Sequence, residues 1–513
     1  MNLTDDVLAI EELRRAVASG VPETVAITAV SNIWPLYSAH FAELTTAIEA
    51  LPLPVLERYP VLRVVHRMTP VLARSTRPFK PLMSPDLTRT MSADELDVLT
   101  LAQMIAFRFS GDVAAAMIYA RRLEDRVLQL HADARDRTDG PLWYYHQQIG
   151  STLLAAGLSG RALLQFATAR QLGRLAPQVD AERMALGRAA LAYAVRGSLD
   201  DADRALAAAR LRPPATGAHV SSTATTECTT AALIEVERMT PEAEGRLDGL
   251  EPYDSIELSW PFALLARTRW FGAQQRPEEA MEAVRLASDA HPDQHGSFAS
   301  DVVAAASIDA LCSLGATASA RRLVETSVEV GPLTRLAIVR HALLEARFTP
   351  AEQGLRRLGS EQGLGPGQRA EVLLLSVWLE SARNDGVTPD SAQHVLRLSR
   401  HGGARRMLAT MPIQVVDHVR AALPEEDGGA FEESIAGLLH IDVPPRPILT
   451  TGELRVLGAL HERATTQAIA LSLQVSPNTI KSQLRTLYRK LGCTTRDEAI
   501  RIASRLHLTT YDV

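Results

Sequence analysis

Hydrogen-bond donors and positive charges gather on one side of a helix that the sequence predicts over residues 477–490. Ser476 is a good N-cap, and Pro477 suits the first helical position, where its missing N–H costs nothing. One arc of this helix carries polar and basic side chains and no acid: Asn478, Lys481, Ser482, Arg485 and Arg489. The opposite arc is apolar, with Ile480, Leu484, Leu487 and Leu491 at i, i+4, i+7 and i+11. A helix packed on one side and cationic on the other has the chemistry to bind a polyanion.

Three more predicted helices position this one. Thr450 and Glu453 form a capping box at the start of the first helix, and the second begins at Thr465 or Thr466. The tight segment 474–476 leads into the cationic helix, and Thr495 with Glu498 opens a fourth helix. The residues that would share the core are Leu454, Leu457, Leu460, Ile469, Ala470, Leu473, Ala499, Ile502, Ala503 and Leu506.

This unit resembles the LuxR/FixJ-type four-helix DNA-binding domain. The matching residues are Leu449, Thr450, Glu453, Val456, Leu457, Ile469, Ala470, Leu473, Val475, Ser476, Thr479, Ile480, Lys481, Leu487, Tyr488, Arg489, Lys490, Leu491, Gly492, Arg496, Glu498 and Ala499. The resemblance implies that helix 477–490 lies in the major groove of double-stranded DNA. By motif position, Lys481, Ser482 and Arg485 face base edges. Those expected to hold phosphates are Thr465, Asn478, Thr479 and Arg489.

The resemblance also implies a homodimer, because the family's fourth helix commonly forms a dimer contact, here Glu498 to Leu506. The chain departs from the family at three places. Arg463 stands where Gly is usual, Thr466-Gln467-Ala468 where Asn-Lys-Glu is usual, and Gln483 where His is common. The missing Lys and Glu weaken local polar contacts, whereas the hydrophobic framework is intact.

The charge distribution separates this unit from the rest of the chain. The 513 residues carry a formal charge of −6, which excludes a globally basic binder. Residues 447–513 hold nine basic and five acidic side chains, a balance of +4, and the other 446 residues balance at −10. We predict a helical-repeat domain over 1–423, a linker region over 424–447 that ends in Pro444-Pro445-Arg446-Pro447, and the DNA-binding domain over 448–513.

The acidic part has helical periodicity from about residue 31 to residue 420, with recurring turn signals. Eight pieces each open with Gly or Pro, continue with a small residue and complete an amphipathic helix: 110–123, 156–172, 196–211, 238–250, 274–287, 314–327, 347–360 and 386–399. The small anchors lie 34 to 46 residues apart: Ala116, Ala162, Ala202, Ala243, Ala280, Ala320, Gly354 and Ala392. This period fits stacked helical hairpins. We therefore predict an all-α protein, an α-solenoid that resembles tetratricopeptide-like arrays; a generic helical bundle is the alternative.

Residues 47–62 resemble the opening repeat of the helical sensor region in MalT-type regulators. An ATPase part precedes that region in those regulators, and we expect it to be lacking here. A phosphate-binding loop needs Gly followed by Lys, and the three lysines follow Phe79, Ile480 and Arg489. A Walker-type ATPase site is therefore excluded.

Other classes of protein have little support. Three distant cysteines favour neither a disulfide framework nor a zinc site, and no hydrolase or metalloprotease motif is present. We expect no enzyme activity, no catalytic or metal-binding residues and no cofactor. The first residues lack a signal peptide and no stretch suits a membrane span, so a cytoplasmic protein is expected. Trp143-Tyr144-Tyr145-His146 could stack a small ligand, although interhelical packing is the favoured interpretation.

Two functions from different classes remain open. The first is a one-component transcriptional regulator, in which the solenoid senses a small molecule or protein effector and the C-terminal domain binds DNA as a dimer. The second is a solenoid scaffold for protein interaction with a vestigial DNA-binding module, which the departures at 466–468 favour. An enzyme hidden in the solenoid is the least supported idea.

Overall fold

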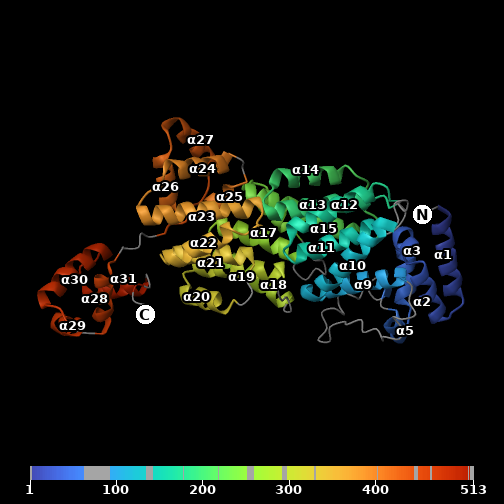
Figure 1. Ribbon diagram of the computed structural model, residues 1–513, viewed down its shortest axis with the longest axis horizontal. Coiled ribbons are helices and arrows are strands. Elements are labelled where there is room, and N and C mark those ends of the chain that lie inside the picture. Colours follow the sequence, from blue (N-terminus) through green and yellow to red (C-terminus); the bar gives the residue numbers. More distant parts are fainter. Residues whose placement is uncertain are drawn as a thin grey trace.

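The computed structural model describes residues 3–59, 61–62, 93–133, 142–176, 178–217, 219–250, 259–291, 297–327, 331–400, 403–443, 449–462, 465–505 and 508. Every regular element in these ranges is a helix, and the one β-type pairing among them is an isolated bridge between Pro412 and Ile441. Figure 1 shows the N-terminal helices at one end of the molecule and the helices of residues 451–505 at the other, with α25 (Arg405–Ala409) lying back beside α17 (Trp260–Ala273). Within the same ranges, no helix combines the length and the apolarity that a bilayer span requires.

Five short helices at the N-terminus pack around a core of their own. They are α1 (Leu3–Ala18), α2 (Pro22–Ser31), α3 (Ile33–Ala39), α4 (Phe41–Glu49) and α5 (Leu53–Arg58). The fully buried side chains of this N-terminal bundle include Leu36, Leu44 and Ile48. Trp34 and Tyr37 on α3 pack against both this core and the core of the following repeats, so α3 joins the two.

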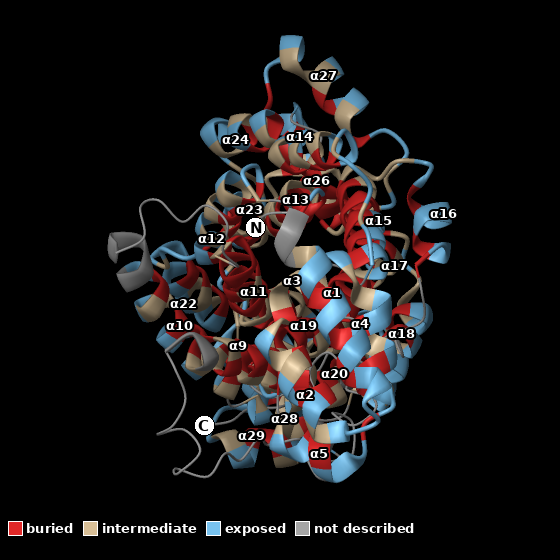
Figure 2. Ribbon diagram, turned by 90° about the vertical axis from the view of Figure 1, so that its right-hand side faces the viewer, coloured by how far each residue is buried: buried red, intermediate tan, exposed pale blue. Residues whose placement is uncertain are grey.

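A long array of helical hairpins follows, and the described ranges contain eight of them. The first helices of the hairpins are α9 (Ala93–Phe109), α11 (Leu142–Ala155), α13 (Ala181–Arg196), α15 (His219–Arg238), α17 (Trp260–Ala273), α19 (Phe298–Ser313), α21 (Pro332–Leu344) and α23 (Pro366–Asn384). The second helices are α10 (Val113–Asp133), α12 (Ser159–Gly173), α14 (Leu199–Arg210), α16 (Ala243–Asp248), α18 (Pro277–Ala290), α20 (Thr317–Thr326), α22 (Phe348–Gly359) and α24 (Pro389–Arg400). Each first helix contacts the first helix of the next hairpin, and Figure 2 shows α11, α13 and α15 as largely buried.

The eight predicted sequence pieces coincide with the second helices. The seven alanine anchors are buried, from Ala116 in α10 to Ala392 in α24, and Gly354 is partly buried. At Gly354 in α22, a Cβ would lie 2.7 Å from Cγ2 of Val339, which shows how closely this helix approaches α21. The predicted α-solenoid is therefore confirmed, because the small residue allows the two helices of a hairpin to approach.

The turn inside each hairpin places one residue in the left-handed region. Four of these residues are glycines, Gly111, Gly157, Gly197 and Gly315, and four are Met239, Gln275, Ala346 and Asp385. In six of these eight turns, a backbone N–H donates to the carbonyl five residues earlier, as from Arg347 to Ala342 at 2.8 Å. The sequence predicted the turns from Gly and Pro, and it gave no sign that non-glycine residues would take this conformation.

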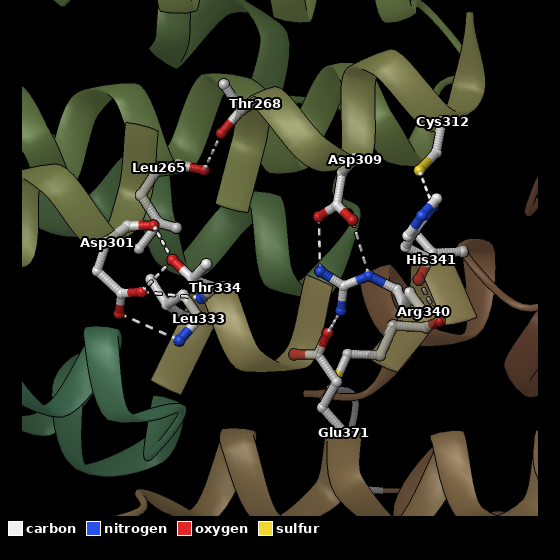
Figure 3. Close-up of polar contacts among 12 residues, drawn as sticks. Leu265, Thr268, Asp301, Asp309, Cys312, Leu333, Thr334, Arg340, His341 and Glu371 are labelled. Atoms are coloured by element: carbon white, nitrogen blue, oxygen red, sulfur yellow. Dashed lines mark hydrogen bonds and ion pairs between the residues drawn. The ribbon is translucent and has the colours of Figure 1, made fainter. Parts of the chain in front are cut away.

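Polar contacts also tie neighbouring hairpins together. The Asp301 carboxylate on α19 accepts hydrogen bonds from the N–H groups of Leu333 and Thr334, at 3.1 and 2.8 Å, and so caps α21 (Figure 3). In the same view, Arg340 on α21 bridges Asp309 on α19 and Glu371 on α23. Three successive first helices are thereby held through one guanidinium group.

The array also contacts itself over a longer distance. The turn after α13 meets the start of α23: a Cβ on Gly197 would lie 2.5 Å from the Cα of Gly367, and a Cβ on Gly365 would lie 2.6 Å from the carbonyl oxygen of Arg196. Only glycine allows such an approach of two backbones. Hairpins that are far apart in sequence are therefore in direct contact.

The array ends in three helices, α25 (Arg405–Ala409), α26 (Ile413–Ala422) and α27 (Glu425–Ile435). In α27, Phe431 is fully buried and Ile435 nearly so, both within the core that α24 and α26 share. Part of the predicted linker region 424–447 is therefore packed structure. Its proline-rich end, Pro444 to Pro447, lies outside the described residues.

Four helices form the C-terminal unit, with a separate core. They are α28 (Thr451–Glu462), α29 (Thr466–Leu473), α30 (Pro477–Leu491) and α31 (Arg496–Arg505). They match the four helices predicted from the sequence, and Figure 1 draws them as a distinct unit at one end of the molecule.

Candidate nucleic-acid interface

The start of α30 is fixed by local sequence. The Ser476 hydroxyl accepts a hydrogen bond from the N–H of Thr479 at 3.1 Å, and Pro477 occupies the first turn. Before it, Gln474 ends α29 in the left-handed conformation, with φ of 56°, and Val475 donates its N–H to the carbonyl of Ala470. The tight segment between α29 and α30 is thus a helix–turn–helix connection whose two ends are both capped.

The two faces of α30 separate as the sequence predicted. Ile480 and Leu487 are fully buried, Leu491 is buried and Leu484 is partly buried. The predicted contact residues on the opposite face are all exposed: Asn478, Thr479, Lys481, Ser482, Arg485 and Arg489. The domain therefore presents an exposed, acid-free row of donors along α30.

Thr465 lies one helix earlier, at the start of α29. It is exposed, and its hydroxyl accepts a hydrogen bond from the N–H of Ala468 at 3.2 Å. The helix N-termini of α29 and α30 both carry partial positive charge, which favours anions such as phosphates. Thr465 and Ser476 thus stand at two ends that suit the same kind of ligand.

A buried carboxylate holds α30 against α28. Glu453 and Thr450 form the predicted capping box, with the Thr450 N–H donating to Glu453 at 2.7 Å. The same carboxylate oxygen accepts a hydrogen bond from the Lys490 ammonium at 2.7 Å. Burial raises the pKa of Glu453, but Lys490 and the Thr450 donors outweigh it and hold the pKa below its ordinary value. The contact between Glu453 and Lys490 therefore holds α30 in its position relative to α28.

The fourth helix is anchored by the second predicted capping box. Thr495 and Glu498 exchange backbone-to-side-chain hydrogen bonds of 3.2 Å, and Arg496 donates to the carbonyl of Leu460 at the end of α28. Ala499 and Ala503 are buried against the domain core, whereas Leu506 lies outside the described residues. The Glu498 carboxylate is thus engaged within its own domain.

The comparisons with known proteins concern this part of the chain. Residues 447–503 match the family model described as "Bacterial regulatory proteins, luxR family". The C-terminal domain belongs to the LuxR family.

Two kinds of relative match the LuxR-family domain. The "Transcriptional regulatory protein YdfI" of Bacillus subtilis (strain 168) is 42% identical over 64 residues, which are 12% of this chain and 30% of that protein. The "HTH-type transcriptional regulator MalT" of Yersinia pestis (strain Pestoides F) is 43% identical over 58 residues, 11% of this chain and 6% of that protein. The matches therefore cover less than a third of either relative. No solved structure matches the chain.

The departures from the family pattern fall at identifiable places in the LuxR-family domain. Thr466, Gln467 and Ala468 form the first turn of α29, directly after Thr465. Gln483 is partly buried, and a Cβ on Gly452 of α28 would lie 3.2 Å from its Nε2 atom. Gln483 therefore packs on α28 rather than on the exposed face, and Arg463 lies outside the described residues.

Sequence reasoning missed the contact between Glu453 and Lys490. Both residues belonged to the matched motif, but they lie 37 positions apart and no local pattern pairs them. The signal that could have indicated this contact is the scarcity of lysine. Because the chain has only three lysines, one that lies in the same domain as a capping glutamate is a candidate for a specific ion pair.

Proposed function

We propose that this protein is a one-component transcriptional regulator that binds double-stranded DNA through its LuxR-family domain. The observation that carries the proposal is the exposed, acid-free face of α30, whose opposite face is buried in the domain core. A helix of this kind can enter the major groove while its packed side holds the domain in place.

Within this proposal the exposed residues form two groups, one that contacts bases and one that contacts phosphates. Lys481 and Arg485 lie one turn apart, and both can donate to guanine O6 and N7, with Ser482 able to contact several bases. The residues that would hold phosphates and set the register are Thr465, Asn478, Thr479 and Arg489. Support comes from the exposure of all four and from the position of Thr465, Asn478 and Thr479 at the N-termini of α29 and α30, whereas Arg489 lies in the last turn of α30.

The proposal includes a homodimer that forms through α31. Two copies would present two α30 helices to half-sites about one helical turn of DNA apart. It also gives the helical-repeat region the task of sensing a small molecule or a protein. The size of that region and its separate core support a role of its own.

The test uses the purified full chain and DNA fragments from the native genome. Fragments that the protein retains are sequenced, and one enriched fragment is then titrated by electrophoretic mobility shift at several salt concentrations. Contacts with several phosphates predict a steep fall in affinity as salt rises, by about 0.9 log units per log unit of salt for each phosphate neutralised. A protein that enriches no sequence and binds no fragment at low salt would not be a DNA-binding regulator.

A second candidate function is a solenoid scaffold with a vestigial DNA-binding module. The first turn of α29 favours it, because Thr466, Gln467 and Ala468 carry no charge there. The salt series separates the two functions, since a scaffold would show no specific fragment at any salt concentration.

A further inference from the structure

A cavity of about 260 Å³ lies where the N-terminal bundle meets the first hairpins. Its walls come from α3 and α4 on one side and from the first helices α9, α11, α13 and α15 on the other. A water molecule occupies about 30 Å³ in the liquid, so the space corresponds to about nine waters. This is room for an organic molecule of roughly ten non-hydrogen atoms.

Arg108 on α9 supplies a buried positive charge to this cavity. Its side chain donates to the carbonyl and side-chain oxygens of Gln148, at 2.9 and 2.6 Å, and to the Thr152 hydroxyl at 3.0 Å. These acceptors are neutral, and among the described residues Nε has no hydrogen-bond partner. Burial and the nearby Arg188 guanidinium lower the pKa of Arg108 to about 9. A buried cation without a carboxylate is costly for the protein and suits an anionic ligand.

The other charged side chain in the wall is also basic. Arg188 on α13 lines the cavity, and none of the described lining residues is an Asp or Glu. Two carboxylates close to the wall are already engaged elsewhere: Asp180 by Thr216, Gln178 and the Nδ1 atom of His219, and Glu227 by Arg183. The electrostatic character of the cavity is therefore positive.

Further buried polar atoms in the wall lack partners among the described residues. They are Oε1 of Gln147, Nε2 of His219 and Oγ1 of Thr223, on residues that are each at least nine-tenths buried. Buried polar groups are normally satisfied, so a group of them around one cavity indicates a bound molecule with polar atoms of its own.

Aromatic rings form the apolar part of the wall. Trp34, Tyr37 and Phe41 come from the N-terminal bundle, and Tyr144 faces them from α11. The Trp34 and Tyr144 rings meet edge to face, with centroids 5.7 Å apart, and the hydroxyls of Tyr37 and Tyr144 lie 3.2 Å apart. The aromatic run 143–146 thus does pack between helices, and Tyr144 also borders the cavity.

We propose that this cavity binds a small organic carboxylate with a flat, apolar body. Arg108 would hold the carboxylate, and the aromatic side chains of α3, α4 and α11 would pack on the body. The inference rests on the proposed function in one respect, that the ligand is the effector sensed by the helical-repeat region. Since the walls belong to both the N-terminal bundle and the hairpins, a bound ligand would contact both and stabilise their interface.

The test is calorimetric titration of the full chain with three probes. Phenylacetate has ring and charge, phenylacetamide has the ring without the charge, and acetate has the charge without the ring. We expect phenylacetate to bind about tenfold or more tightly than either of the others, because a charge-assisted hydrogen bond in a buried site has about that effect. Equal affinity for phenylacetate and phenylacetamide, or no heat with phenylacetate at millimolar concentration, would overturn the proposal.

Two variants locate the site. Arg108→Met should remove the preference for phenylacetate over phenylacetamide, whereas Arg161→Met, which removes an exposed arginine paired with Glu124, should leave it unchanged. Gly187→Leu should abolish binding of both ring compounds without removing a charge, because Gly187 lines the cavity and a Cβ there would have its nearest neighbours at 4.0 Å.

Unchanged binding in Arg108→Met or in Gly187→Leu would show that the site is elsewhere. If Arg108→Met does not fold, the wild-type preference and the Gly187→Leu titration decide the matter together. The titration contains no DNA, so its failure and a failure of DNA binding are separate results.

Discussion

Arg406 on α25 donates to both carboxylate oxygens of Glu237 on α15, each at 3.1 Å, across 169 residues of sequence. Both side chains are more than nine-tenths buried. Glu237 also accepts from Arg269 on α17 at 2.7 Å, and Arg406 approaches Glu371 at 3.8 Å. Glu371 in turn pairs with Arg340, the group shown in Figure 3. A series of buried ion pairs, in which basic and acidic side chains alternate, therefore runs through the inside of the array.

Removing Arg406 from this series of buried ion pairs should destabilise the protein strongly. Arg406→Met removes one guanidinium and leaves Glu237 and Glu371 with less positive charge in a buried place. Removing one partner of a buried ion pair costs about 3–5 kcal/mol. Urea unfolding followed by circular dichroism measures the change. Arg420→Met is the control, because Arg420 and its partner Glu432 are about half exposed and such pairs contribute at most about 1 kcal/mol. Equal stability of the two variants would contradict this account.

Substitutions on the exposed face of α30 should separate base reading from phosphate binding. Lys481→Ala and Arg485→Ala should each cost about 1–3 kcal/mol of specific binding and relax the preference for the selected sequence. Arg489→Ala should weaken binding to all sequences and reduce the salt slope by about 1. Fluorescence anisotropy with selected and scrambled fragments measures both. Arg455→Ala, an exposed arginine on α28, serves as the control, and an equal loss in that variant would show that only total charge matters.

The left-handed turns predict that one substitution has opposite effects at two places. Ala346→Gly should raise the free energy of unfolding by roughly 0.5–1 kcal/mol, because a left-handed L-residue costs about 1–2 kcal/mol and glycine offsets part of this through its greater freedom when unfolded. Ala207→Gly, at an exposed position within α14, should lower it by about 1 kcal/mol. Thermal unfolding of the two variants gives the signs. A lower melting temperature for Ala346→Gly would contradict the prediction.

The strength of the ion pair between Glu453 and Lys490 should depend on pH. Because burial is outweighed by Lys490 and the Thr450 donors, the pKa of Glu453 is lower in the folded domain than in the unfolded chain. Its contribution is therefore present above the ordinary glutamate pKa of about 4.3 and is lost as the pH falls through the folded value. We expect Glu453→Gln to increase amide hydrogen exchange in residues 477–491 at pH 6, and the difference from wild type to shrink as the pH falls below the ordinary glutamate pKa. A difference that stays constant as the wild-type carboxylate is titrated would mean that the charge of Glu453 is not what holds α30.

Local patterns were sufficient to predict the helices of the hairpins and of the LuxR-family domain. A small residue such as Ala202 must be buried where two helices approach, and its spacing from Ala162 and Ala243 repeats along the chain. Capping residues such as Thr450 and Ser476 mark helix starts within one position. These signals lie within a few residues of the feature that they predict.

Contacts between distant residues could not be predicted in this way. Arg406 and Glu237 look like ordinary surface charges in the sequence, and Arg108 has no neighbour in sequence that indicates a cavity. The order of stacking decides which first helices meet, and that order brings Arg108, Gln147 and His219 to one space. The candidate DNA-binding face was predicted because it lies on one helix, whereas the cavity is built from six.

The approach of Gly197 to Gly367 alters what removal of hairpins would do to this protein. In a simple repeat protein each unit touches only its neighbours, so a shortened array keeps the stability of what remains. Here the third hairpin contacts the eighth, so deleting the last repeats would also remove a contact that stabilises the third hairpin. The array should therefore melt as one cooperative body instead of fraying from its ends.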